Sequence, residues 1–325
     1  FSYFLWEDTN DNGLFDGVYN DVTRVVDGGD TVTEVWVKDL MAVEQANFQN
    51  WFNFYRSREL SAKGALHYVL EDMITARIGY TTINSNTDNY PVATMNPSPY
   101  AVGGNKQLLL SKIDATQPNR LNETPLRTAL QGVGEYFSVS TTLASDGITD
   151  MNRFGAGADP YLSALAGGTC QQNYALLFTD GVWNGVDPDL TPPNQDADDF
   201  TNAFDGGLFA DGWELTLADV AMKYYKTDLN ADYADEVPVT AADLEKSNDA
   251  FSSGEKVMHQ HMKTYTLAFG LEGASSVPGA WLDPDPDPTV PIVPTDPARL
   301  DDLNHAAYNG RGNSYTANNF RTLAS

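Results

Sequence analysis

The sequence predicts an α/β protein with a doubly wound, mostly parallel sheet, extended by long loops and β-rich insertions. Two observations carry this prediction. Short apolar runs of strand length, such as Tyr174 to Phe178, alternate along the chain with segments of helical apolar spacing, such as Leu126 to Phe137. The Tyr174 run is also apolar without interruption, as expected for a parallel strand that is buried on both faces.

Predicted strands open the chain. Phe1 to Trp6 is strand-like, and Val22 to Val26 and Thr31 to Val37 flank an Asp-Gly-Gly-Asp turn that predicts a hairpin. Apolar residues at helical spacing then predict one long amphipathic helix from Phe48 to Met73. A further strand is predicted from Arg77 to Ile83.

The rest of the chain alternates loops, helices and strands. The predicted loops, marked by Pro, Gly, Asn and Asp, are Tyr90 to Gly104, Ser140 to Gly168, 184–212 and 281–297. The other predicted elements are a helix after Thr124, a strand from Tyr174 to Phe178, a helix from Leu217 to Tyr225, a strand from Thr264 to Phe269 and a helix from Asp301 to Asn309.

Composition limits the possible functions. The 325 residues are 42% hydrophobic, enough for a substantial core. The net charge of −26 excludes nucleic acid as an expected partner, because its phosphates would be repelled. No apolar run approaches the roughly 20 residues that span a membrane, so we expect no membrane span in this chain. Cys170 is the only cysteine, so no disulfide can form within these residues.

Two residues are candidate ligands of one metal ion. Asp180 follows the apolar run, so it lies at the carboxyl end of a predicted parallel strand, where open α/β sheets bind their ligands. Thr124 precedes a Pro and a segment of helical spacing, which predicts its hydroxyl at a helix N-terminus. Each residue also has a structural interpretation, because Asp180 can open a turn with Gly181 and Thr124 can cap its helix.

Together these two segments resemble the second and third loops of a von Willebrand factor A (vWA) metal-ion-dependent adhesion site, in which a Thr and an Asp share one divalent cation. Such oxygen ligands suit Mg²⁺, Mn²⁺ or Ca²⁺. Four more stretches narrow the resemblance: ANFQNWFNFYRSRELSAKGAL from Ala46, TLADVAMKYYKTDL from Thr216, HQHMKTYTLAFGLEG from His259 and LDDLNHAAYNGRGNSYTANNF from Leu300. From about Phe48 onward, the set and its order are similar to the N-terminal vWA-like domain of the PilC/PilY family of type IV pilus tip adhesins.

The resemblance implies a single vWA-like domain over residues 1–325, Rossmann-like in its topology. It also implies a non-enzymatic, extracellular role in adhesion and type IV pilus assembly, at the pilus tip of a Gram-negative bacterium. The implied partners are a receptor on a host or abiotic surface, and minor pilins or other pilus-tip subunits.

One motif of the family, an Asp-x-Ser-x-Ser after the opening strand, is absent from these residues. Because the family carries a β-rich insertion after this motif, we interpret residues 1–39 as that insertion and place the opening strand upstream of Phe1. A competing interpretation makes Phe1 to Trp6 the opening strand and lets the polar residues after it replace the motif. On the first interpretation, the adhesion-type metal site is incomplete or weak in this chain.

A second candidate metal site is the segment DTNDNGLFD. Side-chain oxygens occur at positions 1, 3, 5 and 9 of an EF-hand-like calcium loop, with a Gly at position 6 and a backbone carbonyl at position 7. The expected Ca²⁺ ligands are Asp8, Asn10, Asn12, Leu14 and Asp16. Position 12 is Tyr19 in place of the usual bidentate Glu, and a metal-free turn is the alternative interpretation.

Two other functions stay open. One is a metal-dependent, protein-binding vWA domain of an unrelated surface protein. The other is a metal-dependent hydrolase acting through Asp180, which is disfavoured because the sequence offers no general base, nucleophile or closed ligand set beside it. His259 and His261 have no third ligand at zinc-like spacing, and we expect them to be structural.

Overall fold

The computed structural model describes residues 1–7, 31–55, 57–84, 89–96, 98, 101–117, 124–138, 159–180, 183–197, 204–246, 257–270, 277–284 and 297–317. The predicted calcium loop, with Asp8, Asn10, Asn12, Leu14 and Asp16, lies outside these residues. The chain divides into two compact units, Phe1–Ser61 and Ala62–Ser325. Each unit is considered by itself below.

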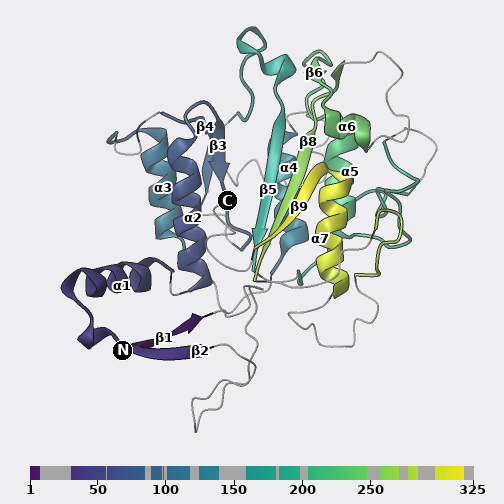
Figure 1. Ribbon diagram of the computed structural model, residues 1–325. Helices are drawn as coiled ribbons and strands as arrows, with labels where there is room; N and C mark the ends of the chain where they lie inside the picture. The colour runs from purple at the N-terminus through teal and green to yellow at the C-terminus, as the bar shows by residue number, and fades with distance from the viewer. Residues whose placement is uncertain are drawn as a thin grey trace. The chain divides into compact units, whose positions relative to one another are not determined.

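The first unit combines a two-stranded sheet with helical segments (Figure 1). Strand β1 (Ser2–Glu7) pairs antiparallel with β2 (Thr31–Trp36), which is followed by a 3₁₀ turn (Val37–Asp39) and helix α1 (Ala42–Tyr55). Aromatic rings pack between sheet and helix, with Tyr3 stacked on Phe48 at 5.3 Å between ring centroids. The partner of β2 is thus β1, whereas the predicted partner, Val22 to Val26, lies outside the described residues.

The prediction of one long helix from Phe48 to Met73 is wrong. The structure has two helices, α1 and α2 (Arg58–Asp72), and α2 starts immediately after Ser57. The Ser57 hydroxyl accepts a hydrogen bond from Leu60 N at 3.2 Å, and the Ser57 carbonyl accepts one from Ser61 N at 2.9 Å. Ser is a preferred residue at a helix start, so Ser57 caps a new helix inside an apolar pattern that continues through it.

A small α/β layer follows in the second unit. Strands β3 (Arg77–Tyr80) and β4 (Tyr90–Thr94) pair antiparallel, and helix α3 (Asn105–Ala115) packs against them. The loop predicted from Tyr90 to Gly104 is therefore wrong for its first five residues, and α3 has no counterpart in the predicted elements. Pro91 obscured β4, although a two-stranded sheet has only edge positions and tolerates a Pro there.

A parallel sheet forms the centre of the second unit. Strands β5 (Asn173–Thr179), β8 (Met262–Phe269) and β9 (Arg311–Ala317) lie in the order β5-β8-β9, and both pairs are parallel. Asn173 is opposite Met262 at one end of the β5–β8 pair, and Thr179 is opposite Ala268 at the other. The molecule is thus mixed α/β with a parallel sheet, which agrees with the predicted α/β class.

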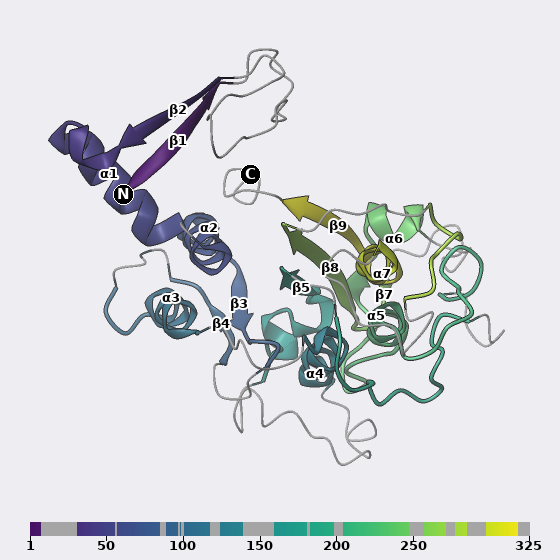
Figure 2. The same ribbon diagram turned by 90° about the horizontal axis from the view of Figure 1, so that it is seen from below.

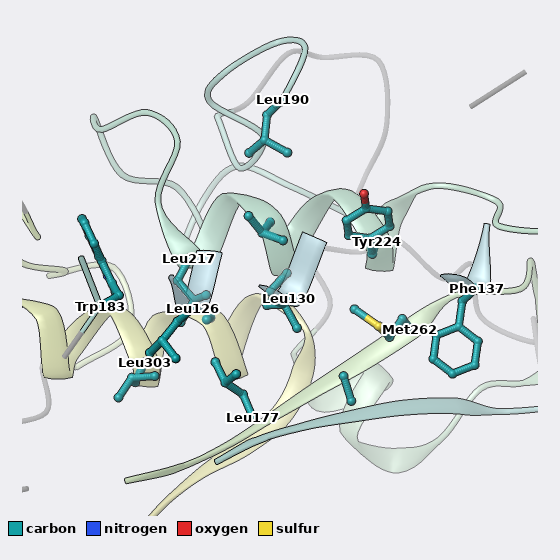
Figure 3. Close-up of a cluster of buried hydrophobic side chains, with 14 of the residues drawn as sticks. Leu126, Leu130, Phe137, Leu177, Trp183, Leu190, Leu217, Tyr224, Met262 and Leu303 are labelled. Atoms are coloured by element: carbon teal, nitrogen blue, oxygen red, sulfur yellow. The ribbon is translucent and has the colours of Figure 1, made fainter. Parts of the chain in front are cut away.

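Three helices cover one face of this sheet: α4 (Leu126–Phe137), α5 (Leu217–Lys226) and α7 (Pro297–Asn309) (Figure 2). Their apolar residues meet Leu177 of β5 and Met262 of β8 in the main core (Figure 3). Along β5, however, Ala175 and Leu177 are buried, whereas Tyr174 and Leu176 are 50% and 59% exposed. The expectation of a strand buried on both faces is therefore wrong, because among the described residues α4, α5 and α7 cover only one of them.

Short elements complete the described part of the second unit. They are two 3₁₀ turns (Ala164–Ala166 and Gly168–Cys170), the antiparallel pair β6 (Val237–Pro238) and β7 (Val257–Met258), and helix α6 (Ala241–Glu245). In the parts of the chain described here, no helix is both long and apolar enough to cross a membrane.

Candidate functional site

The carboxyl end of β5 is where the sequence predicts a shared metal site. Asp180 directly follows β5 and is exposed, and Thr124 lies two residues before the first residue of α4. Two hydrogen bonds join Thr124 and Asn184: Thr124 N donates to the side-chain oxygen Oδ1 of Asn184, and Asn184 N donates to the Thr124 carbonyl at 3.0 Å. The structure thus ties the Thr124 loop to the loop that begins with Asp180.

The start of α4 differs from the expectation for Thr124. Pro125 occupies the N-cap position and no side chain caps the helix, so the Thr124 hydroxyl lies one residue before the cap. The Thr124 carbonyl accepts from Leu126 N at 2.8 Å and from Asn184 N, and its hydroxyl does not serve as the helix cap. The capping interpretation of Thr124 is therefore wrong, and the metal-ligand prediction stays a prediction.

Trp183 fixes the loop that follows Asp180. The guanidinium carbons of Arg127 and Arg299 lie 3.9 Å and 4.5 Å from the centroid of the Trp183 ring, close enough for cation–π attraction. Arg127 also pairs with Asp187 of the same loop at 2.9 Å. Helix α4, which starts beside Thr124, therefore holds this loop through a buried arginine.

Asp302 of α7 holds both Trp183 and the start of α5 through hydrogen bonds. Its Oδ2 accepts from the Trp183 indole N–H at 2.6 Å, and the carboxylate also accepts from Leu217 N at 3.0 Å and Ala218 N at 3.1 Å. The N–H groups of Leu217 and Ala218 lie in the first turn of α5, where backbone N–H groups have no partner within the helix and a negative charge is favoured. Burial raises the pKa of Asp302, and these hydrogen bonds oppose the rise.

A second polar cluster is buried between α7 and the segments 194–197 and 204–211. It consists of Asp196, Asp211 and His305, whose side chains are 0%, 3% and 2% exposed. His305 Nε2 donates to the Phe209 carbonyl at 2.5 Å and lies 3.4 Å from Asp196 Oδ2, and His305 Nδ1 lies 3.4 Å from Asp211 Oδ2. One ligand-capable atom of each residue lies within 4.8 Å of the other two.

Neighbouring groups orient this cluster. Asn309 Nδ2 donates to Asp196 Oδ2 at 2.8 Å, and Asp211 N donates to Asp196 Oδ1 at 3.2 Å. The Trp281 ring stacks on the His305 ring, with centroids 4.1 Å apart and an 11° angle between the planes. The imidazole is therefore fixed in both position and orientation.

Burial and neighbouring carboxylates raise the pKa values of the acidic groups at this cluster. Burial is the main cause that raises the pKa of Asp196 to about 8; His305 opposes the rise, and Asp219 and Asp211 add to it. Burial likewise raises the pKa of Asp219 to about 6, against hydrogen bonds from Thr216 and Gln195. Burial lowers the pKa of His305, but the hydrogen bond with Asp211 and the charge of Asp196 outweigh it, so the pKa of His305 is raised.

Sequence reasoning did not identify this cluster. Asp196 and Asp211 belong to the predicted long loop 184–212, and His305 belongs to the predicted helix from Asp301 to Asn309, where it was not singled out as a ligand. The one local signal was the density of Asp in the loop. Of the two histidines that we expect to be structural, His261 is buried and its Nδ1 lies 2.9 Å from the His259 carbonyl oxygen.

Comparison with known proteins identifies relatives of this chain. No protein-family model matches it, and no solved structure matches it. It is 25% identical over 304 residues to the type IV pilus biogenesis factor PilY1 of Pseudomonas aeruginosa strain PAO1, and 27% identical over 308 residues to PilY1 of strain UCBPP-PA14. Each alignment covers 84% of this chain. PilY1 of strain PAK is 26% identical over 263 residues, or 73% of this chain.

The chain spans about a quarter or less of the length of these relatives, between 20% and 25%. The shared region nevertheless includes most of the chain, so the relationship is not confined to one motif. The resemblance to type IV pilus proteins is confirmed at this level: over most of its length the chain is similar to PilY1 sequences, which are named as type IV pilus biogenesis factors.

Proposed function

We propose that this chain is an extracellular module of a type IV pilus factor that acts in adhesion and pilus assembly at the pilus tip. The observation that carries the proposal is the similarity to three PilY1 sequences over 73% to 84% of the chain. The proposed partners are a receptor on a host or abiotic surface, and minor pilins or other tip subunits. The proposed role is binding, with no catalytic residue.

We further propose that the second unit has a vWA-like fold, with its working face at the carboxyl end of β5. Three parallel strands with α4, α5 and α7 on one face support this proposal. So does the joining of the Thr124 loop to the loop after Asp180 through Asn184. Ligand sites of open α/β sheets form at this end of the strands.

In this proposal, Thr124 and Asp180 contribute oxygen ligands to a cation such as Mg²⁺, and a carboxylate or carbonyl of the partner completes its shell. A cation held by few protein ligands keeps open positions, and a partner oxygen can fill one. The Ca²⁺ loop predicted at Asp8, Asn10, Asn12, Leu14 and Asp16 remains a proposal of the same kind, in which the ion offsets the repulsion between Asp8 and Asp16.

The test replaces the two proposed ligands in the gene of the source bacterium. Thr124→Val and Asp180→Asn keep the side-chain shapes and remove the hydroxyl and the charge, and Asp232→Asn removes an exposed carboxylate as a matched control. Cells are scored separately for surface pili and for attachment to a solid surface.

We expect Thr124→Val and Asp180→Asn to lower attachment at least severalfold, and Asp232→Asn to leave it unchanged. A loss of attachment with normal pili assigns the face to adhesion, and a loss of both assigns it to assembly. If both variants make normal pili and attach normally, the proposed working face is wrong.

A further inference from the structure

We infer that Asp196, Asp211 and His305 form a binding site for one first-row transition dication, with Zn²⁺ the favoured ion. The site lies in the second unit, between α7 and the segments 194–197 and 204–211. It is separate from the proposed cation position at Thr124 and Asp180, and it requires a different class of metal.

The separation between His305 Nδ1 and Asp211 Oδ2 fits two ligands of one ion. A charge-assisted hydrogen bond between nitrogen and carboxylate measures about 2.7–2.9 Å. His305 Nδ1 lies instead at 3.4 Å from Asp211 Oδ2, and the other ring nitrogen, Nε2, lies 3.4 Å from Asp196 Oδ2. Two ligands at about 2.1 Å from a tetrahedral Zn²⁺ are separated by about 3.4 Å. One ligand atom from each of the three residues lies within 4.8 Å of the other two.

The hydrogen bonding of His305 prepares one nitrogen for a metal. Nε2 donates to the Phe209 carbonyl at 2.5 Å, so Nδ1, which faces Asp211 Oδ2, is the ring nitrogen that a metal can take in place of a proton. Metal-binding histidines commonly donate their other ring N–H to a carbonyl or carboxylate, which fixes the tautomer and the ring. The stacked Trp281 ring adds a second constraint on the same imidazole.

The side-chain oxygen of Asn309 supplies an independent indication that the cluster binds a cation. The residue is 0% exposed, and within the described part of the chain its Oδ1 has no hydrogen-bond partner. Its Nδ2 donates to Asp196 Oδ2, so the same amide group carries the unsatisfied oxygen at the cluster. A buried amide oxygen without a donor is unfavourable, and a metal ion, or a water bound to it, would satisfy it.

The charges around the cluster also favour a cation. The carboxylates of Asp196, Asp211 and Asp219 repel one another. Lys226 is held by Asp205 at 2.6 Å and by the Gln195 carbonyl at 2.6 Å. A dication would balance the negative charge of the two carboxylates in the cluster.

The ligand set selects the class of ion. Ca²⁺ and Mg²⁺ prefer shells of oxygen alone, whereas imidazole suits Zn²⁺ and its first-row neighbours. Two carboxylates with one imidazole match a Zn²⁺ site, which takes four ligands and binds more tightly than Mn²⁺ or Fe²⁺ at comparable donors. We therefore expect Zn²⁺ to bind here and Ca²⁺ not to compete.

The experiment measures metal binding by the purified chain after removal of bound metal with a chelator. Zn²⁺, Mn²⁺ and Ca²⁺ are titrated separately by calorimetry, and retained metal is counted by elemental analysis after gel filtration. Asp211→Asn and His305→Gln test the ligands. His67→Gln is the control, because His67 and Asp114 form an exposed pair at 2.8 Å that can hold an adventitious ion.

We expect one tightly held Zn²⁺ per chain, a loss of affinity of at least tenfold in Asp211→Asn and His305→Gln, and no change in His67→Gln. Equal zinc affinity in folded Asp211→Asn or His305→Gln, or preferential binding of Ca²⁺ to the cluster, would overturn the inference. If those two variants do not fold, X-ray absorption on zinc-loaded His67→Gln decides: one imidazole with oxygen ligands supports the site, and sulfur or two imidazoles refutes it.

Discussion

Gly134 of α4 lies in close contact with Tyr224 of α5. A Cβ added at this position would lie 2.3 Å from both Cγ and Cδ2 of Tyr224, and 2.5 Å from its Cδ1. Tyr224 is 2% exposed and belongs to the main core. The Gly134→Ala substitution therefore tests whether the two helices pack as closely as the structure shows.

Two opposing effects set the size of the result. In an exposed helix, Gly→Ala stabilises by about 1 kcal/mol, because Ala has the higher helix propensity. Carbon atoms in contact are ordinarily about 3.5–4.0 Å apart, so the new methyl overlaps the Tyr224 ring by more than about 1 Å. Overpacking of a core costs about 1–3 kcal/mol, and this overlap belongs at the upper end of that range. The net expectation is a loss of about 2 kcal/mol.

The assay is urea unfolding of the wild-type chain, Gly134→Ala, Tyr224→Leu and the double variant. Because Leu lacks the ring that meets the new methyl, we expect a coupling energy between the two positions of about 2 kcal/mol. Gly212→Ala is the control, since a Cβ there meets nothing within 4 Å, and its effect should stay within about 1 kcal/mol. Stabilisation by Gly134→Ala in the wild-type background would refute the packing of α4 on α5.

Two further predictions concern buried ionisable groups. Burial lowers the pKa of His261 from 6.5 to about 4, so the unfolded chain binds the proton more tightly than the folded chain. The free energy of unfolding therefore falls, by up to ~3 kcal/mol, as the pH falls from about 6.5 to 4. His261→Asn should lack this component in pH-dependent unfolding, and an unchanged profile would contradict the prediction. Lys263 and Asp243 form a buried pair at 2.6 Å, so Asp243→Ala should cost about 3–5 kcal/mol in urea unfolding. Adding Lys263→Met should recover part of that loss, and a double variant less stable than Asp243→Ala would contradict the pairing.

The sequence predicted those elements whose apolar pattern is strong and local. Helix α4 and strand β5 were found because Leu126, Leu130 and Phe137 recur at helical spacing and Tyr174 to Phe178 is a continuous apolar run. It missed the boundary at Ser57, where one hydroxyl starts a new helix without interrupting the periodicity. Periodicity records which face is buried, and it does not record a cap.

The site could be predicted only where residues close together in the sequence form it. Asp180 was found because it ends a strand, but its relation to Thr124 depends on Asn184, which has no signal of its own. The buried cluster was not predictable, because Asp196 and Asn309 are 113 residues apart and meet only in the folded chain. Burial, which raises the pKa of Asp196, is likewise a property of the tertiary structure.

The proposed contribution of this chain to type IV pilus function can be tested in the source bacterium. The experiment is an in-frame deletion of the codons for residues 62–317, with surface pili counted and surface attachment scored in the same cells. We expect that pili, attachment or both are lost and are restored when the intact gene is supplied. A strain with the deletion that keeps a normal number of pili and attaches normally would contradict the proposal.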